Sequence, residues 1–220
     1  MKGMKNIKAF IFDLDGVIVD TAKYHYLAWK DLADSLGFDF TEHDNERLKG
    51  VSRVRSLEIL LEIGQKEFDE QTKTELATRK NNQYVGLISK MTPEEILPGV
   101  TNFLQATKDA AIKIVLGSAS KNAPLILEKI GLAHLFDAVI DGNKVSNAKP
   151  DPEVFLKGAA AVKVDNNQCI VFEDAVAGIE AAKNAEMVAI GVGDPITLAS
   201  ADAVIAGFDG LTVHELLKMI

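Results

Sequence analysis

Short apolar runs rich in β-branched residues alternate with helix-forming segments after Pro98, and one further apolar run lies near the start of the chain. Near-continuous apolar strands joined by crossover helices are typical of a parallel sheet that is covered on both faces. The sequence therefore predicts an α/β fold. We expect strands at 8–14, 112–117, 138–140, 168–172, 188–192 and 203–205, and helices at 100–110, 123–130, 152–162, 177–184 and 211–219.

The segment from Thr21 to Thr92 interrupts this alternation. It has apolar residues at helical spacing in 26–36, 54–63 and 68–88, but no convincing strand pattern. A crossover between parallel strands needs only about a dozen residues, so this segment is too long for a simple connection. We therefore expect a Rossmann-like doubly wound parallel sheet in residues 1–18 and 96–220, and an inserted α-helical cap domain in residues 19–95.

The composition limits the kinds of partner. The 220-residue chain has a formal net charge of -8, which argues against nucleic acid or an anionic membrane as the main partner. Cys169 is the only cysteine, so an intrachain disulfide and a thiolate zinc cluster are excluded, as suits a reducing cytoplasm. No stretch of the sequence is apolar enough to span a bilayer. We expect a cytoplasmic monomer that acts on a small molecule.

Two of the expected strands end in pairs of carboxylates. Asp13 and Asp15 follow the first apolar run, and Glu173 and Asp174 follow the run 169–172. If both strands are central and parallel, the four groups meet at one sheet edge, where like charges ~4 Å apart repel by about 4 kcal/mol at an effective dielectric near 20. A cation relieves this repulsion, and oxygen ligands without a nearby histidine or thiol favour Mg²⁺. The alternative is that these residues only cap helices.

Two further stretches fit a phosphate ligand. The run 117–122 leads from a strand into a helix start, where a serine hydroxyl and backbone N–H groups can bind an anion. Lys149 lies between two expected strands and is fixed by Pro150, so that its ammonium can offset negative charge. The bond between these two residues is also a candidate cis peptide. The alternatives are that Ser118 or Ser120 only caps a helix and that Lys149 is a solvated loop residue.

The stretches DLDGV, GSAS, AKPDP and FEDA occur in this order, at 13–17, 117–120, 148–152 and 172–175. They resemble the four motifs of the haloacid-dehalogenase-like phosphotransferase superfamily, and the resemblance covers the whole chain. It implies that Asp13 is a nucleophile that forms an aspartyl-phosphate and that Asp15 is the general acid and base. It also implies that Ser118 and Lys149 bind the transferred phosphoryl group. The implied ligands of Mg²⁺ are Asp13, the backbone carbonyl of Asp15, Glu173 and Asp174.

The helical insert carries features of a second phosphate site. The turn KGVSR at 49–53 puts a glycine between a lysine and an arginine, so backbone N–H groups and a guanidinium can surround a phosphate. Each charge alone is more simply interpreted as a solvated surface group. Together with SASKN at 118–122, the turn resembles the sugar-phosphate mutases of the superfamily. That resemblance implies interconversion of β-D-glucose 1-phosphate and glucose 6-phosphate through β-glucose 1,6-bisphosphate, which carries two phosphates and is the expected intermediate and activator.

The resemblance also assigns residues to the site. The implied catalytic residues are Asp13, Asp15, Thr21, His25, Ser118 and Lys149. The implied substrate-binding residues are Trp29, Lys49, Gly50, Val51, Ser52, Arg53, Ser56, Lys80, Ala119, Ser120, Lys121 and Asn122. Among them, His25, Trp29 and Lys80 would contact the sugar or position Asp15. Two features depart from the family pattern: Gly117 stands where alanine is expected, and Arg55 adds a charge after Arg53.

Three other functions fit parts of this pattern. A sugar-phosphate phosphatase on the same fold uses water as the acceptor and needs no second phosphate site, so Arg53 would be dispensable to it. A receiver-like signalling domain also has acidic residues, a lysine and a phosphoaspartate, but it needs neither Asp15 nor a helical insert. A dehalogenase attacks carbon and has no use for a metal pair such as Glu173 and Asp174.

Overall fold

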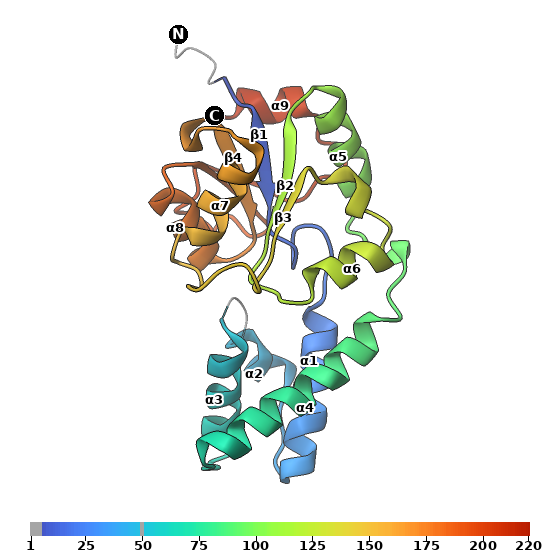
Figure 1. The fold of residues 1–220 in the computed structure, drawn as a ribbon, viewed down its shortest axis with the longest axis vertical. Helices are drawn as coiled ribbons and strands as arrows, with labels where there is room; N and C mark the ends of the chain where they lie inside the picture. The colour runs from blue at the N-terminus through green and yellow to red at the C-terminus, as the bar shows by residue number, and fades with distance from the viewer. Residues whose placement is uncertain (1–5, 49–50) are drawn as a thin grey trace. The chain divides into compact units, whose positions relative to one another are not determined.

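A parallel six-stranded sheet forms the centre of the larger part of the molecule (Figure 1). The computed structural model describes residues 6–48 and 51–220. Within them the strand order is β3-β2-β1-β4-β5-β6, with every neighbouring pair parallel, which confirms the predicted doubly wound α/β fold. The strands are β1 (Ala9–Phe12), β2 (Lys113–Gly117), β3 (Ala138–Ile140), β4 (Cys169–Glu173), β5 (Val188–Val192) and β6 (Ala203–Ile205).

Both faces of the sheet are buried. Successive residues of a strand point to opposite faces, and in β1 both kinds of position are apolar. Ile11 belongs to a cluster that includes Phe155 of α7, whereas the ring of Phe10 stacks on Phe103 of α5 with ring centroids 6.0 Å apart. The helices of this part are α5 (Val100–Asp109), α6 (Ala123–Lys129), α7 (Glu153–Val162), α8 (Val176–Asn184) and α9 (Val213–Lys218), and 3-10 turns occur at Pro93–Glu95, Ala133–Leu135 and Asn166–Gln168.

The chain divides into two compact units. The α/β unit comprises the chain up to Asp20 together with Thr92–Ile220, and the helical unit is Thr21–Met91. The helical unit has its own apolar core, in which Trp29 and Leu32 of α1 pack with Leu60 of α3. Its helices, blue to green in Figure 1, are α1 (Ala22–Leu36), α2 (Glu42–Glu46), α3 (Arg53–Ile63) and α4 (Glu70–Ile88).

The start of α1 and the whole of α2 differ most from the sequence-based expectation for the helical unit. Helix α1 begins at Ala22 rather than at residue 26, because its first turn is held by the carbonyl of Thr21, which accepts the N–H of His25 at 3.0 Å, and not by apolar residues. Helix α2 was not expected, since it is too short to show a period. A capping box between Thr41 and Asp44 stabilises it. No helix in the described parts of the chain is long and apolar enough to cross a membrane.

Candidate active site

The carboxylates at the carboxyl ends of β1 and β4 lie together at one edge of the sheet. The two strands pair in parallel with Phe12 opposite Phe172, so the next residues, Asp13 and Glu173, lie side by side. Carboxylate oxygens of Asp13, Glu173 and Asp174 lie within 4.8 Å of one another. Asp13 is 7% exposed and Glu173 is 1% exposed. Buried carboxylates in such a group need a cationic partner.

Lys149 supplies one positive charge to this group. Its Nζ donates to Oδ1 of Asp13 at 2.5 Å and to Oε1 of Glu173. The Lys149 side chain is only 6% exposed, and Nζ lies 4.9 Å from the centre of the Phe155 ring. The peptide bond to Pro150 is cis, as predicted. Lys149 is therefore a buried partner of the acidic group and not a solvated loop residue.

One ammonium does not balance the acidic group. Burial alone would lower the pKa of Lys149, but the carboxylates of Asp13 and Glu173 outweigh it and raise that pKa. Burial raises the pKa of Glu173, and Lys149 opposes this effect. Burial, together with repulsion from Asp13 and Glu173, raises the pKa of Asp174 to about 8. The surplus of negative charge favours a further cation among these oxygens.

The donor set fits Mg²⁺. Mg²⁺ prefers carboxylate, carbonyl and water oxygens, and the cluster offers three carboxylates. Neither histidine nor cysteine belongs to this cluster, which is the one group of three or more potential side-chain ligands in residues 6–48 and 51–220. Cys169 lies at the opposite end of β4 from Glu173, and burial raises the pKa of its thiol to about 11. A soft, thiolate-bound metal is therefore excluded here.

The turn after β1 brings Asp15 beside Asp13. The backbone N–H of Asp15 donates to Oδ2 of Asp13 at 3.1 Å, and the next residue, Gly16, has φ +73°. A Cβ on Gly16 would lie 2.1 Å from Oδ2 of Asp174. Only glycine therefore allows this turn to pass beside Asp174. This constraint on Gly16 could not be predicted from the sequence, because it depends on a residue far away in the chain.

The loop after β2 has the form of an anion-binding loop. Ser118, 1% exposed, uses its Oγ to accept the N–H of Ser120 at 3.1 Å, and Oγ of Ser120 accepts the N–H of Asn122 at 3.3 Å. Because each hydroxyl acts here as an acceptor, it can still donate its own proton to an anion. Neither serine caps α6, whose N-cap position is Asn122. A Cβ on Gly117 would lie 3.0 Å from the Phe155 ring, which accounts for the missing alanine.

A second buried cation lies inside the helical unit. Lys80 of α4, 3% exposed, lies with Nζ 2.8 Å from Nδ1 of His25 and 4.4 Å from the centre of the Trp29 ring. The Tyr84 ring stacks on His25 with centroids 4.1 Å apart. Burial first, then Lys80 and Arg53, lower the pKa of His25 well below its usual value. A neutral imidazole therefore accepts a hydrogen bond from the ammonium. Tyr84 was not predicted as part of this cluster, although it lies one helical turn after Lys80.

The residues expected to bind a phosphate in the helical unit are only partly described. Lys49 and Gly50 lie outside the described residues. Val51 is 40% exposed, and Ser56 is buried. Arg53 is half-buried at the start of α3. Thr21, which was expected to be catalytic, is fully buried. Burial lowers the pKa of Arg53. Ser52 is the N-cap of α3, where its Oγ accepts the N–H of Arg55 at 3.3 Å.

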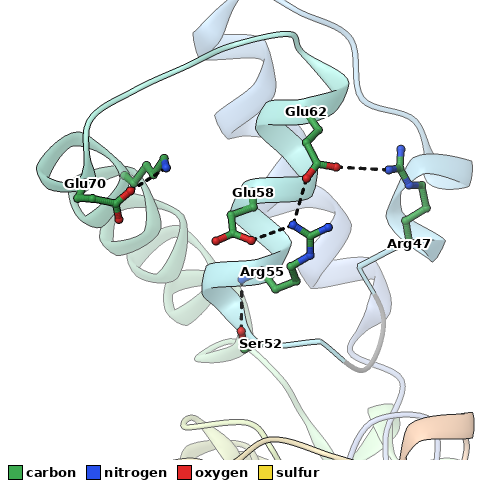
Figure 2. A network of polar contacts seen from close by, with 7 residues as sticks. Arg47, Ser52, Arg55, Glu58, Glu62 and Glu70 are labelled. Carbon is green, nitrogen blue, oxygen red and sulfur yellow. Dashed lines mark hydrogen bonds and ion pairs between the residues drawn. The ribbon is translucent and has the colours of Figure 1, made fainter.

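Arg55, the extra charge of this turn, lies on the exposed face of α3. Its Nη1 lies 2.8 Å from Oε2 of Glu58 and 3.1 Å from Oε1 of Glu62 (Figure 2). Glu62 also lies 3.9 Å from Arg47, which comes from the other side of the turn. Arg55 is thus taken up by ion pairs within the helical unit.

Comparisons with known proteins agree with this geometry. The family model of haloacid dehalogenase-like hydrolases matches residues 7–186. The chain is 47% identical over 212 residues to a beta-phosphoglucomutase of Bacillus subtilis, which covers 96% of this chain and 94% of that protein. A crystal structure of beta-phosphoglucomutase from Clostridium difficile has a TM-score of 0.91 and 45% identity, and the match covers 97% of this chain and 96% of that chain.

A phosphatase is also similar, at lower identity. The phosphorylated carbohydrates phosphatase of Thermotoga maritima is 32% identical to the chain over 182 residues, 81% of this chain and 82% of that protein. The matches share the α/β architecture and extend over most of the chain. The buried acidic group and its lysine come from the same matched segment, residues 7–186. The chain therefore belongs to the haloacid dehalogenase-like hydrolase family.

Proposed function

We propose that the chain is a Mg²⁺-dependent β-phosphoglucomutase. It would interconvert β-D-glucose 1-phosphate and glucose 6-phosphate through an aspartyl-phosphate on Asp13 and through β-glucose 1,6-bisphosphate. The observation that carries the proposal is the 47% identity, over 94% of its length, to a protein named beta-phosphoglucomutase. The buried contact between Asp13 and Lys149 supports the phosphoryl-transfer step.

Asp13 would act as the nucleophile. A carboxylate oxygen of Asp13 forms a bond to phosphorus while the bond from phosphorus to the sugar oxygen breaks. Lys149 and the hydroxyl of Ser118 would offset the charge on the phosphoryl oxygens. The N–H of Asp15 and the ammonium of Lys149 each hold one oxygen of Asp13, which keeps the carboxylate oriented. Mg²⁺, bound by Asp13, Glu173, Asp174 and the carbonyl of Asp15, would supply further positive charge.

Asp15 would move the proton. In the first half-reaction Asp15 would remove a proton from the 6-hydroxyl of β-glucose 1-phosphate as that oxygen attacks phospho-Asp13 and the bond from phosphorus to Asp13 breaks, which forms the bisphosphate. After the bisphosphate has turned end for end, Asp15 would give the proton to O1 as Asp13 attacks the 1-phosphate, so that glucose 6-phosphate leaves and phospho-Asp13 forms again. Proton transfer of this kind contributes about 10²–10⁴ in rate.

The second phosphate requires a second set of donors. The bisphosphate has a phosphate at each end, and only one of them reacts at a time. We assign Ser120, Lys121 and Asn122 of the α/β unit to the other phosphate, and we separately propose Arg53 of the helical unit as a phosphate-binding residue. The half-buried guanidinium of Arg53 has the fork geometry that binds phosphate with two hydrogen bonds.

Phosphorus NMR tests the proposal. Protein with Mg²⁺, β-glucose 1-phosphate and a trace of glucose 1,6-bisphosphate should produce glucose 6-phosphate. Asp13→Asn should abolish the conversion, and Arg53→Ala should slow it about 10-fold or more, since charge-assisted hydrogen bonds contribute more than neutral ones. Arg79→Ala is the matched control, because Arg79 is an exposed arginine of the same unit that lies 3.9 Å from Asp31. It should convert substrate at the wild-type rate.

The alternative function is sugar-phosphate hydrolysis. The similarity to the Thermotoga maritima phosphatase favours this candidate over the other rivals. Release of inorganic phosphate from several sugar phosphates, without glucose 6-phosphate formation and without an effect of Arg53→Ala, would replace the mutase by a phosphatase. The roles proposed for Asp13 and Asp15 would still hold.

A further inference from the structure

The loop after β3 packs directly on the loop after β2. Strands β2 and β3 are neighbours, with Gly117 opposite Ile140, so the two loops leave the same sheet edge. The N–H of Gly142 donates to the carbonyl of Ser120 at 3.2 Å. The Nδ2 of Asn143 donates to the carbonyl of Lys121 at 3.0 Å. We call residues 141–143 the brace.

Gly142 allows the brace to approach this closely. A Cβ at this position would lie 2.2 Å from the carbonyl oxygen of Ala119 and 3.0 Å from Cγ of Lys121. The first atom is backbone, so an added methyl group has to displace the chain itself and not a flexible side chain. The constraint comes from this contact and not from a left-handed backbone, since the φ of Gly142 is not in that region.

Asp141 holds Asn143 in place. Asp141 is 4% exposed, and its Oδ1 accepts the N–H of Asn143 at 2.7 Å. The amide of Asn143 is then directed at the carbonyl of Lys121. Asp141 is buried while Asn143 is exposed, so the anchored end of the brace lies inside and the donating end outside.

The brace donates hydrogen bonds to two consecutive carbonyls, those of Ser120 and Lys121. A trans peptide is planar, and its N–H points opposite to its C=O. Fixing these carbonyls therefore fixes the N–H groups of the following residues, Lys121 and Asn122. The side chains that we assign to the second phosphate, those of Ser120, Lys121 and Asn122, branch from this same stretch of backbone.

We infer that Gly142 and Asn143 are positioning residues that set the affinity for the second phosphate of the sugar bisphosphate. They act through the loop 119–122 and do not touch the ligand. The inference rests on the proposed function, because that function requires a bisphosphate to bind.

Calorimetric titration with β-glucose 1,6-bisphosphate tests the inference. The parent protein is Asp13→Asn with Mg²⁺, in which the ligand is not consumed. Adding Gly142→Ala should weaken binding about 10-fold or more, and adding Asn143→Ala should weaken it a few-fold, because one exposed hydrogen bond is lost. Gly207→Ala is the matched control, because a Cβ there meets no atom within 4 Å and the φ is ordinary. It should bind as the parent does.

Kinetics of the proteins that retain Asp13 provide the second readout. For positioning residues of the second phosphate, KM should rise about as much as Kd while kcat changes less than threefold. The inference is overturned if Gly142→Ala binds within twofold of Gly207→Ala, or if kcat falls and KM does not rise. If Gly142→Ala does not fold, the bisphosphate affinities of Asn143→Ala and Asn143→Asp test the inference instead. The carboxylate of Asn143→Asp cannot donate a hydrogen bond to the Lys121 carbonyl, so this variant should bind the bisphosphate no more tightly than Asn143→Ala.

Failure of the proposed function gives a different result. If Gly142→Ala weakens binding of the bisphosphate but the protein that retains Asp13 does not isomerise glucose phosphates, the proposed mutase function is wrong. The inference about the brace then still holds. No binding of the bisphosphate by the parent protein overturns both.

Discussion

The two units of the molecule each contain a network of charged side chains, and the networks lie in opposite environments. In the α/β unit, the side chains of Lys149, Asp13 and Glu173 are 6%, 9% and 2% exposed. In the helical unit, those of Arg55 and Glu62 are 50% and 52% exposed (Figure 2).

The difference in burial has energetic consequences. Charges taken out of water lose several kcal/mol of hydration each, and an excellent ion pair only roughly repays this loss. A buried network is therefore weak evidence for stability and stronger evidence for chemistry. Exposed pairs lose little hydration and contribute little. We expect the buried network to govern activity and the exposed network to be nearly dispensable.

The largest effect is expected from Lys149→Met. It leaves Asp13 and Glu173 without their ammonium, so turnover should fall about 10³-fold, the upper range for loss of one donor to a developing charge. In the metal-free protein the free energy of unfolding should fall by about 3–5 kcal/mol, because a buried charge loses its partner. Steady-state kinetics and denaturation in EDTA measure both effects.

Lys113→Met is the control for this variant. Lys113 lies 2.8 Å from Asp137 in the same unit, but its side chain is 51% exposed. Turnover should stay at the wild-type level. If Lys149→Met and Lys113→Met lowered the free energy of unfolding equally, burial would not explain the effect of Lys149→Met.

The second effect concerns the metal. Adding Mg²⁺ to EDTA-treated protein should raise its stability by about 2.7 kcal/mol when the ion is at about 100 times its Kd. The double variant Glu173→Gln, Asp174→Asn should lose this response, whereas Glu62→Gln in the helical unit should keep it. Differential scanning calorimetry with and without Mg²⁺ measures the response. An unchanged response in the double variant would place the cation elsewhere.

The buried network could be predicted from sequence because its geometry follows from topology. Asp13 and Glu173 each come at the end of an apolar run, and parallel strands bring such ends to one sheet edge. The contacts of Gly142 and Asn143 could not be predicted in this way. They depend on how closely two loops about twenty residues apart approach each other, and no periodicity or motif encodes that distance.

The helical unit was less predictable for a related reason. Helical spacing indicated the positions of α3 and α4, but α1 begins four residues before its apolar repeat and the short helix α2 depends on the capping box of Thr41 and Asp44. The pattern also gave no means of telling Arg53 from Arg55. They differ in burial and in partners, which follow only from the packing of α3.

The third effect concerns His25, whose imidazole lies beside the buried ammonium of Lys80 in the helical unit. Burial, with Lys80 and Arg53, lowers the pKa of His25 in the folded state, so below the ordinary histidine pKa of about 6.5 the unfolded chain binds more protons. Stability should therefore be complete above pH 6.5 and fall as the pH drops below it, by at most about 1.4 kcal/mol per pH unit.

Trp29, the only tryptophan, lies in the same unit and reports its unfolding by fluorescence. The difference between the stability profiles of the wild type and His25→Gln isolates the contribution of His25. His43→Gln, at an exposed histidine of the same unit, should leave the profile unchanged. A His25→Gln profile parallel to that of the wild type from pH 7 to pH 5 would contradict the assignment.

The smallest effect is expected from Arg55→Met. The variant removes the ion pairs with Glu58 and Glu62, but the three side chains are 50%, 42% and 52% exposed, so water and salt already screen them. Trp29 fluorescence should show a small shift of the denaturation midpoint at low salt and none near 1 M salt, where the Debye length is about 3 Å. Arg53→Met makes the same chemical change two positions earlier, on a half-buried guanidinium, and only that variant should raise the KM of the mutase reaction. An equal rise in KM for both variants would mean that the exposed network also serves the site, and that burial does not separate the two networks by function.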